Sequence, residues 1–452
     1  MCGVVGVYNV ENAARTALEG LRLLQHRGQD GAGLVVALPD GTLERKRGRG
    51  DVQSIFSDPH EWAFPGRAAI AHTRYATQGE QTEDNIQPIK SATFFPFQIP
   101  ISIAHNGNFS NFLELQQRLG GFYQTTTDTE IIFHLMHNSP ERDLEKRILD
   151  AAAHVDGSYS MLILTSEKLY AMRDPAGFRP LIIGRIGDGF IVSSERYGFG
   201  RVGADVVRDV NPGEMVVFEG NQMLSRKIGR TSERKYHCIF ELVYFANPAE
   251  TQNRVEVSEF RFRSGMMLYG EEEHPARIDV VVPVMDSGLD AAYGYHKASG
   301  IDLVRGIYRN HHVGRTFIQP TQEERRKSLR EKQIPVSAMI KGKRIKLVDD
   351  SIVRGNTTKG LVKMARDAGA LEVHVGIASP PVRWVCEFGI ANGPVEDLIA
   401  RTYEGNVERV REYIDADTLT YLSVPGLLKA TGMGDAQQRY CTYCLTGEKP
   451  EF

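Results

Sequence analysis

The stretch KRIKLVDDSIVRGNTTKGLVKMARDAGA, residues 343–370, decides the fold of the second half of the 452-residue chain. Residues 345–348 are a mostly apolar run typical of a strand in a parallel sheet, and the carboxylates Asp349 and Asp350 follow directly. A loop that runs through Thr358 follows, and beyond it apolar side chains recur at helical spacing until Gly369, a common residue at a helix end. The stretch therefore predicts a strand, a loop and a helix, the repeating unit of an α/β domain.

The loop of this unit has the composition of a phosphate-binding site. Backbone N–H groups at a helix start attract a phosphate, and threonine hydroxyls add donors. An acid pair ahead of such a loop suits sugar hydroxyls or a hydrated Mg²⁺ ion. The alternative is a strand–turn–helix with ordinary capping residues, but generic loops rarely combine an acid pair, a glycine and a threonine pair. The candidate phosphate ligands are Arg354, Gly355, Asn356, Thr357 and Thr358.

The hydrophobic pattern divides the chain near residues 228–237, a charged stretch with the character of a linker. Ahead of it, short strand-like segments alternate with two helical stretches, which predicts a layered α+β domain. Behind it, near-continuous apolar strands predict an α/β domain with a parallel sheet and ligands at the carboxyl ends of its strands. We therefore expect one domain over residues 2–230 and a second over residues 231–452.

Composition excludes several classes of protein. The chain is 41% hydrophobic and 25% charged, with a formal charge of -3. These values predict a soluble globular protein without a broad surface for nucleic acid or anionic membrane. No apolar run approaches the length of a membrane span, and no basic-then-apolar leader is recognisable. A cytoplasmic location is expected.

The first ten residues, MCGVVGVYNV, place a cysteine directly behind the initiator methionine. Aminopeptidases remove methionine readily before small side chains, which would make Cys2 the first residue. Its thiol would then lie beside a free α-amine, whose ordinary pKa of about 7.7–8.0 suits a general base at neutral pH. A terminal nucleophile of this kind needs no histidine partner. Taken alone, an early cysteine without a function is the more frequent case.

Three further motifs follow Cys2 in an order that favours a catalytic site. Arg74 in AHTRYAT ends a strand-like run, where its guanidinium can hold a substrate carboxylate. Asn106 and Gly107 in IAHNGN offer a side chain and a backbone N–H to an oxyanion. Asp128 in TTTDTE can take a substrate ammonium. Each motif also has an ordinary explanation: a surface arginine for the first, a hairpin turn for the second and a helix cap for the third. These explanations fit a single motif well, but they do not explain why all three follow Cys2 in this order.

These motifs resemble those of two families. Cys2 and the three motifs behind it are similar to the N-terminal nucleophile (Ntn) glutaminase domain of class II glutamine amidotransferases, and LQHRGQDGAG (24–33) and RDPAGFRPL (173–181) complete the likeness. Residues 343–370 resemble the 5-phosphoribosyl-1-pyrophosphate (PRPP) loop of type I phosphoribosyltransferases. That likeness implies that Arg354 to Thr358 hold the 5-phosphate, and that Asp349 and Asp350 face the ribose hydroxyls and the metal. VVPVMDSG (281–288) resembles the pyrophosphate-side loop, in which Ser287 assists the metal.

A glutaminase joined to a PRPP loop resembles the amidophosphoribosyltransferase family, the glutamine PRPP amidotransferases. The likeness implies an Ntn hydrolase αββα sandwich followed by a type I phosphoribosyltransferase α/β domain. It implies that glutamine, PRPP and water give 5-phosphoribosylamine, glutamate and pyrophosphate, the first step of purine (IMP) synthesis, with ammonia passed between the sites. It also implies one Mg²⁺ per subunit, a homotetramer and feedback by purine nucleotides. VGRTFIQPTQ (313–322) resembles the family's closing loop, and Arg315, Arg325, Arg326 and Lys327 could close over a pyrophosphate.

The other four cysteines include one C-x-x-C pair. Spacing alone leaves open a zinc site, an iron–sulfur cluster, a redox pair or buried inert thiols. One branch of the family carries a structural [4Fe–4S] cluster at cysteines in these contexts, and the chain resembles that branch, which implies one cluster per subunit. Members of the branch commonly have a short propeptide, whereas here Met1 precedes the catalytic cysteine directly. The implied ligands are Cys238, Cys386, Cys441 and Cys444.

Two other functions compete with a bifunctional enzyme. A non-catalytic PRPP- or nucleotide-sensing regulator could use the same α/β domain, but the intact acid pair, Cys2 and Arg74 disfavour it, as does the lack of a DNA-binding segment. An ammonia-only transferase with an inactive glutaminase is expected if Met1 stays attached, because an acylated α-amine is no base.

Overall fold

The computed structural model describes residues 1–58, 64–75, 79–80, 82–94, 96–229, 232–272, 276–310 and 333–450. The predicted closing-loop residues Arg315, Arg325, Arg326 and Lys327 lie outside these ranges. The predicted domain boundary, between residues 230 and 231, also lies outside them and stays a prediction. No described helix is both long and apolar enough to cross a membrane.

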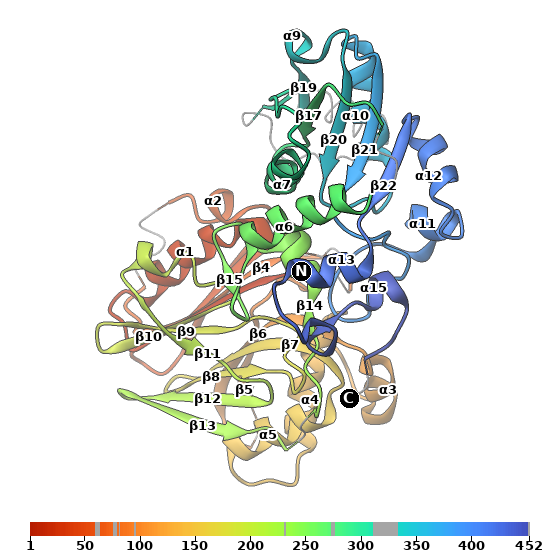
Figure 1. Ribbon diagram of the computed structural model, residues 1–452. Helices are drawn as coiled ribbons and strands as arrows, with labels where there is room; N and C mark the ends of the chain where they lie inside the picture. Colours follow the sequence, from red (N-terminus) through yellow and green to blue (C-terminus); the bar gives the residue numbers. More distant parts are fainter. Residues whose placement is uncertain are drawn as a thin grey trace.

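Two antiparallel sheets form the first half of the molecule (Figure 1). In spatial order, the seven-stranded sheet consists of β11 (Asp205–Asp209), β9 (Ile182–Ile186), β10 (Gly189–Ser193), β1 (Gly3–Tyr8), β4 (Ala68–Arg74), β2 (Gly31–Ala37) and β3 (Leu43–Arg49). The six-stranded sheet consists of β13 (Gln222–Lys227), β12 (Glu214–Glu219), β8 (Leu169–Arg173), β7 (Gly157–Leu164), β6 (Ile99–Phe109) and β5 (Ile89–Phe94).

Three apolar layers hold this half together. Val4, Val35 and Ile70 of one sheet pack against Leu162 and Val216 of the other, so the two sheets lie face to face. Helices cover both outer faces and bury their apolar stripes there, which gives the expected αββα sandwich. The helices are α1 (Ala13–Leu23) and α2 (Val52–Ile55) on one side, and α3 (Phe112–Leu119), α4 (Ile131–Asn138) and α5 (Leu144–His154) on the other.

A four-stranded parallel sheet forms the second half, as residues 343–370 predict. Its strands, in spatial order, are β17 (Val280–Pro283), β20 (Arg344–Asp349), β21 (Glu372–Ile377) and β22 (Thr418–Tyr421). The described helices of this half are α6 (Val257–Gly270), α7 (Leu289–Ser299), α9 (Ser337–Ile340), α10 (Asn356–Asp367), α11 (Ile399–Thr402), α12 (Val407–Ile414), α13 (Val424–Ala430), α14 (Ala436–Arg439) and α15 (Tyr443–Thr446).

Among the residues that the structure describes, this half also has three two-stranded sheets. They pair β14 (His237–Cys238) with β23 (Tyr440–Cys441), β15 (Thr251–Gln252) with β16 (Val255–Glu256), and β18 (Ile307–Arg309) with β19 (Gln333–Pro335). The first pair brings the end of the chain back to the start of this half. Short helical turns lie at η1 (Gln25–Arg27), η3 (Asp128–Glu130), η4 (Phe199–Val202) and η7 (Val395–Asp397), and a π-helix, η5, spans Glu241–Phe245.

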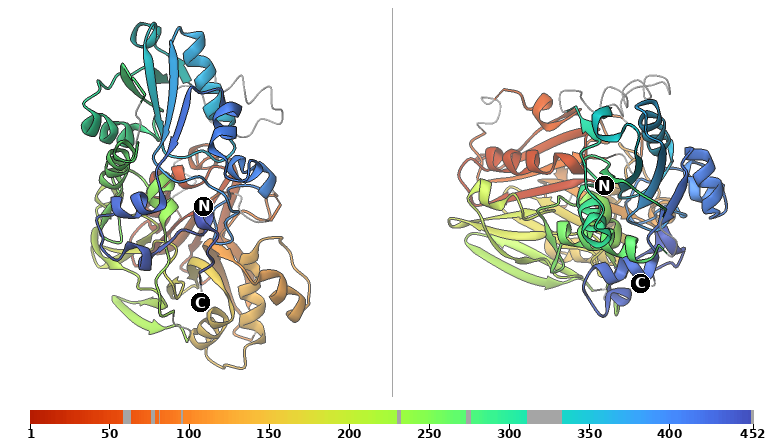
Figure 2. Two further views of the ribbon diagram at one scale, coloured as in Figure 1. Left: turned by 45° about the vertical axis from the view of Figure 1, so that its right-hand side comes forward. Right: turned by 45° about the horizontal axis from the view of Figure 1, so that its top comes forward.

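The N-terminus lies where the two halves meet (Figures 1 and 2). Met1 is fully buried in an apolar cluster built mainly from the second half, including Ile239, Phe260 and Leu422. Direct hydrogen bonds also join the halves: Asn108 Nδ2 donates to the Glu387 carbonyl at 2.8 Å, and Ser158 Oγ donates to the Phe388 carbonyl at 2.7 Å. The predicted nucleophile therefore lies at the junction and not on the outer surface.

Candidate functional site

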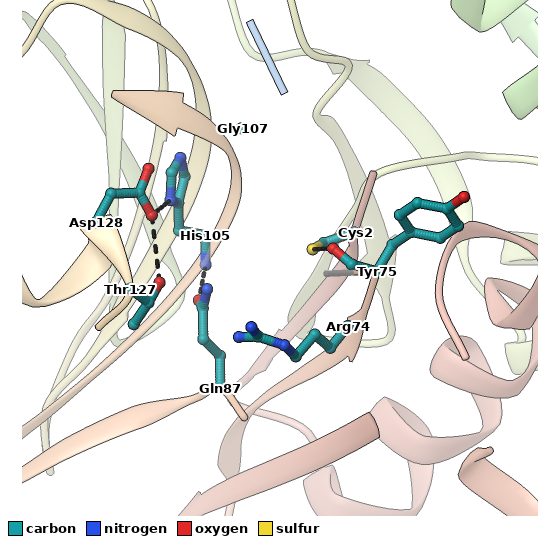
Figure 3. Close-up of a pocket in the computed structure, with 8 residues that line it drawn as sticks. All are labelled: Cys2, Arg74, Tyr75, Gln87, His105, Gly107, Thr127 and Asp128. Carbon is teal, nitrogen blue, oxygen red and sulfur yellow. Dashed lines mark hydrogen bonds and ion pairs between the residues drawn. The ribbon is translucent and has the colours of Figure 1, made fainter. Parts of the chain in front are cut away.

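Strand pairing brings the first predicted site together (Figure 3). Because Gly3 of β1 lies opposite Thr73 of β4, Cys2 and Arg74 come side by side at the end of the sheet. Cys2 and Tyr75 lie on one side of the pocket and Asp128 on the other, with the Arg74 side chain reaching between them. The residues that line the pocket are Cys2, Arg74, Tyr75, Gln87, His105, Gly107, Thr127 and Asp128.

The immediate surroundings of Cys2 are polar. Its backbone N–H donates to Oδ1 of Asn106 at 3.1 Å, and its thiol points to the carbonyl of Tyr75 at 3.6 Å. In the structure Met1 is present, so this N–H belongs to a peptide bond, and burial lowers the pKa of the Met1 amine to about 5. Removal of Met1 would turn the nitrogen that Asn106 holds into the α-amine of Cys2.

Asn106 and Gly107 lie inside β6 and not in a turn, so the hairpin-turn alternative is wrong. Nδ2 of Asn106 is buried and has no hydrogen-bond partner within the described part of the chain. A Cβ on Gly107 would lie 1.9 Å from the Ser158 carbonyl oxygen, so this position requires glycine. An amide donor without a partner, next to a glycine that lines the same pocket as the thiol, suits an oxyanion.

Arg74 and Asp128 supply opposite charges to the pocket. Nη2 of Arg74 donates to the Glu80 carbonyl at 3.1 Å, and the guanidinium also contacts the carbonyl of Asn85. Asp128 begins η3, and its Oδ2 accepts from the Phe109 N–H at 2.9 Å. The pocket therefore offers a cation for a carboxylate and an anion for an ammonium.

His105 and Gln87 line the pocket but were not singled out from the sequence. Oε1 of Gln87 accepts from the His105 N–H at 2.7 Å. The His105 ring stacks on Phe109 at 4.4 Å, and burial lowers its pKa. His105 directly precedes Asn106 in IAHNGN, which is a local signal for it. Gln87 reaches the pocket only through the tertiary fold, and nothing near it in the sequence marks it.

The second predicted site lies at the carboxyl edge of the parallel sheet. Asp349 is the last residue of β20, and Ser287 follows the neighbouring strand β17, so Ser287 Oγ donates to Oδ1 of Asp349 at 2.8 Å. Both acids of the pair are buried. Burial and the charge of Asp350 raise the pKa of Asp349, and burial raises that of Asp350. The two carboxylates repel each other when both are charged. A divalent cation, or hydrogen bonds from sugar hydroxyls, would relieve the repulsion between them, and the Ser287 hydroxyl lies beside them.

The predicted phosphate loop leads directly into α10, which begins at Asn356 and not after Thr358 as expected. The reason is Gly355, whose left-handed φ of 75° turns the chain into the helix one residue earlier than the threonines. Thr357 and Thr358 therefore belong to the first turn, where backbone N–H groups lack partners within the helix. Arg354 pairs with Asp397 at 3.0 Å beside this turn.

The four remaining cysteines come from distant segments to one place. Cys238 lies opposite Cys441 in the β14–β23 pair, and the Arg383 N–H donates to the Cys444 carbonyl at 2.9 Å, which draws the segment of Cys386 toward them. Burial, and then the other three thiols, raise the pKa of Cys444. Cysteine thiols are the donors that zinc and iron–sulfur sites use. In the described ranges, no group of three or more His, Cys, Asp or Glu side chains has the arrangement of a metal site.

Comparisons with known proteins show the family of the chain. A family model of the glutamine amidotransferase domain matches residues 72–199. The amidophosphoribosyltransferase of Bacillus subtilis (strain 168) is 40% identical over 456 residues, which cover 99% of this chain and 94% of that protein. The amidophosphoribosyltransferase of Archaeoglobus fulgidus is 39% identical, with 100% of this chain and 98% of that protein covered.

Solved structures give the same result for the fold. The glutamine PRPP amidotransferase of B. subtilis, complexed with ADP and GMP, superimposes with a TM-score of 0.91 at 39% identity and covers 99% of this chain and 97% of that one. A structure described as the allosteric regulatory enzyme of purine biosynthesis gives a TM-score of 0.92 at 39% identity, over 99% and 96% of the two chains. The expected pair of an Ntn sandwich and a phosphoribosyltransferase domain is therefore confirmed.

Proposed function

The chain belongs to the amidophosphoribosyltransferase family, and from this premise we propose which of its residues carry the two half-reactions. It is a glutamine amidotransferase and pentosyltransferase that converts glutamine, PRPP and water to 5-phosphoribosylamine, glutamate and pyrophosphate, with ammonia passed between its sites. We assign glutamine hydrolysis to residues 2–230 and phosphoribosyl transfer to residues 231–452. The observation that carries the assignment is the pocket shared by Cys2, Arg74, Gly107 and Asp128.

In the glutamine half-reaction, the Cys2 thiolate attacks the side-chain amide of glutamine. The α-amine exposed by loss of Met1 takes the thiol proton and gives it to the departing ammonia. Arg74 holds the α-carboxylate of the substrate, and Asp128 holds its α-ammonium. The Asn106 side chain and the Gly107 N–H stabilise the tetrahedral oxyanion, and water then hydrolyses the glutamyl thioester.

Ammonia has to reach the second site before water protonates it. Tyr75 lines the pocket, and its ring meets the ring of Phe245, from the second half, edge to face at 6.1 Å. This contact supports a covered exit from the glutamine pocket toward the PRPP site. Nucleophilic attack by ammonia on the ribose C1 then displaces pyrophosphate.

In the PRPP half-reaction, Arg354, Gly355, Asn356, Thr357 and Thr358 hold the 5-phosphate. Asp349 and Asp350 accept hydrogen bonds from the ribose hydroxyls, and Ser287 with these two acids would hold one Mg²⁺. The ion, when bound, neutralises the charge of the leaving pyrophosphate. Arg315 is assigned to the closing loop on the family likeness alone.

A [4Fe–4S] cluster is the proposed occupant of the four-cysteine site, supported by the convergence of Cys238, Cys386, Cys441 and Cys444. The cluster would be structural. Iron content and visible absorbance of anaerobically purified protein test this, since a colourless sample with stoichiometric zinc contradicts it.

We propose regulators from a solved neighbour, and the assembly and location from the family likeness alone. The B. subtilis neighbour is complexed with ADP and GMP, which supports feedback by purine nucleotides on this chain. A homotetramer in the cytoplasm is the expected setting, and size-exclusion chromatography with light scattering tests the assembly.

The assignment is tested by a paired assay of phosphoribosylamine formation from glutamine or from ammonia. Cys2→Ala should abolish the glutamine reaction and keep the ammonia reaction, because only the first half-reaction uses the thiol. Equal loss of both would contradict two separable sites. Intact mass of the active protein should show that Met1 is absent, and full glutamine turnover by protein that retains Met1 would contradict the role of the α-amine.

A further inference from the structure

Arg27 lies between the N-terminal residues and the second half of the chain. It ends the short helical turn η1, and its side chain is fully buried. Its Nε donates to the backbone carbonyl of Cys2 at 3.0 Å. The guanidinium therefore holds the residue whose thiol and amine are proposed to react, although it does not line the substrate pocket.

Two buried carboxylates fix this guanidinium from opposite parts of the chain. Glu195, two residues beyond β10, accepts from Nη1 of Arg27 at 2.5 Å. Glu241 accepts from Nη1 at 3.1 Å and from Nη2 at 2.8 Å. Arg179, also buried, lies 3.5 Å from Glu241. Two cations thus face two anions, and the fork geometry leaves the Arg27 guanidinium one orientation.

Glu241 is the first residue of the π-helix η5, which follows the sandwich in the chain. Arg261 of α6 holds this π-helix, because its Nε donates to the Leu242 carbonyl at 2.9 Å and its Nη2 to the Ala246 carbonyl at 2.8 Å. The negative charge of Asp350 partly offsets the lowering of the Arg261 pKa by burial. A continuous set of contacts therefore runs from the carbonyl of Cys2 toward the acid pair of the second site.

We propose that Arg27 is a positioning residue for the Cys2 nucleophile, and that Glu241, supplied by the second half of the chain, fixes Arg27 in place. The inference rests on the proposed role of Cys2. Holding the Cys2 carbonyl limits rotation about the bond to its Cα, so the thiol and the amine keep one direction relative to glutamine. The positive charge nearby also favours the neutral amine, the form that can accept the thiol proton.

The proposed role and a purely structural role of Arg27 and Glu241 predict different pH profiles for glutamine hydrolysis. The proposed role predicts the following changes. Glu241→Gln removes a negative charge near the amine and should lower the pKa of that amine. Arg27→Met removes a positive charge and should raise it. The acidic limb of the pH profile for glutamine hydrolysis then moves to lower pH in Glu241→Gln and to higher pH in Arg27→Met. Loss of packing alone gives no such opposed shifts.

The experiment measures glutamate release between pH 5 and 9 by the full chain with PRPP and Mg²⁺, after intact mass has shown that Met1 is absent. We expect the two limbs to move in opposite directions by about half a unit or more. We also expect kcat to fall roughly tenfold or more with a smaller change in KM for glutamine. In Arg27→Lys the acidic limb should lie at the pH of the parent chain, because the ammonium keeps the positive charge. Only part of kcat should return relative to Arg27→Met, because lysine lacks the forked hydrogen-bonding geometry of the guanidinium.

Glu214→Gln is the matched control, since Glu214 forms a two-bond pair with Arg208 in the same domain. The acidic limb of the pH profile of Glu214→Gln should stay at the pH of the parent chain. The inference is overturned if the acidic limb stays at the same pH in both Glu241→Gln and Arg27→Met. It is also overturned if the limb moves in the same direction in both variants. If Arg27→Met does not fold, the direction of the shift in Glu241→Gln decides alone. Glutamine hydrolysis by the parent chain that does not depend on Cys2 would overturn the proposed function, and this inference with it.

Discussion

Asn106 uses the two ends of one amide for different contacts. Its Oδ1 holds the nitrogen of Cys2, and its Nδ2 has no partner in the part of the chain that the structure describes. A buried donor without a partner costs about 1–3 kcal/mol. The proposed oxyanion would satisfy this donor only during catalysis. Asn106→Ala should therefore lower kcat for glutamine by about 10²–10³-fold, measured as glutamate release.

Asn111→Ala is the control for this change. Nδ2 of Asn111 donates to the His154 carbonyl at 3.0 Å, and its Oδ1 accepts from the Asp156 N–H at 3.0 Å. Neither hydrogen bond involves the pocket. It should cost about 1 kcal/mol of stability and leave kcat close to that of the parent chain. Equal loss of glutamine turnover in both variants would show that Asn106 acts through folding.

The buried carboxylates Asp349 and Asp350, at the end of β20, lower the stability of the folded state when they are charged. The pKa values of Asp349 and Asp350 are raised by burial, so their contribution to stability is complete below the ordinary pKa of 3.8 and is lost as the pH rises above it. Asp350→Asn removes one of these buried charges. Without Mg²⁺, its Tm should equal that of the parent chain near pH 4 and exceed it by about 2 °C or more at pH 8.

The same variant should lose phosphoribosylamine formation from glutamine and from ammonia, because both use the second site. Asp367→Asn serves as the control and should show neither effect, because Asp367, the last residue of α10, forms an exposed pair with Lys363. A Tm gain that does not depend on pH would contradict the assignment of the acid pair.

The start of α10 depends on a left-handed glycine. A Cβ on Gly355 would lie 2.6 Å from Cδ1 of Ile399, whereas one on Gly342, with a similar φ of 72°, would meet no atom within 4 Å. Both changes to alanine should cost about 1 kcal/mol of stability. Only Gly355→Ala should also raise KM for PRPP, several-fold, because it displaces the N–H groups of the first turn. Steady-state kinetics distinguish them, and an equal rise in KM in Gly342→Ala would contradict a phosphate site at Gly355.

Local patterns predict the elements but not every contact between them. The apolar run before Asp349 predicts an acid pair at the carboxyl edge of a parallel sheet, because carboxyl ends of parallel strands meet there. Ser287 is assigned to the same edge through the family likeness, since its turn alone is an ordinary one. The sequence predicts the first turn of α10 too late in the chain, since the conformation of Gly355 depends on its surroundings. Gln87 bonds His105 across 18 residues, and Glu241 bonds Arg27 across 214 residues. No local pattern encodes either contact.

The two halves of the molecule meet directly behind the glutamine pocket. A Cβ on Gly389 would lie 3.0 Å from the backbone of Gly107, so the segment that carries Cys386 packs on the proposed oxyanion residue. Asn108 and Ser158 bond the carbonyls of Glu387 and Phe388 in the same segment. Strand β6 and its neighbour β7 therefore connect glutamine hydrolysis to the position of the second half.

This junction should control how much ammonia escapes. The double variant Asn108→Ala/Ser158→Ala removes two interdomain hydrogen bonds, each of which contributes about 1 kcal/mol, without altering a pocket-lining side chain. A looser junction lets water reach the ammonia before it attacks PRPP. The ratio of phosphoribosylamine formed to glutamate released should then fall clearly below that of the parent chain, while the rate of glutamate release changes little. Asn111→Ala in the same domain should keep the parent ratio. An unchanged ratio in the double variant, with Tm lowered, would show that these bonds stabilise the fold without enclosing the route.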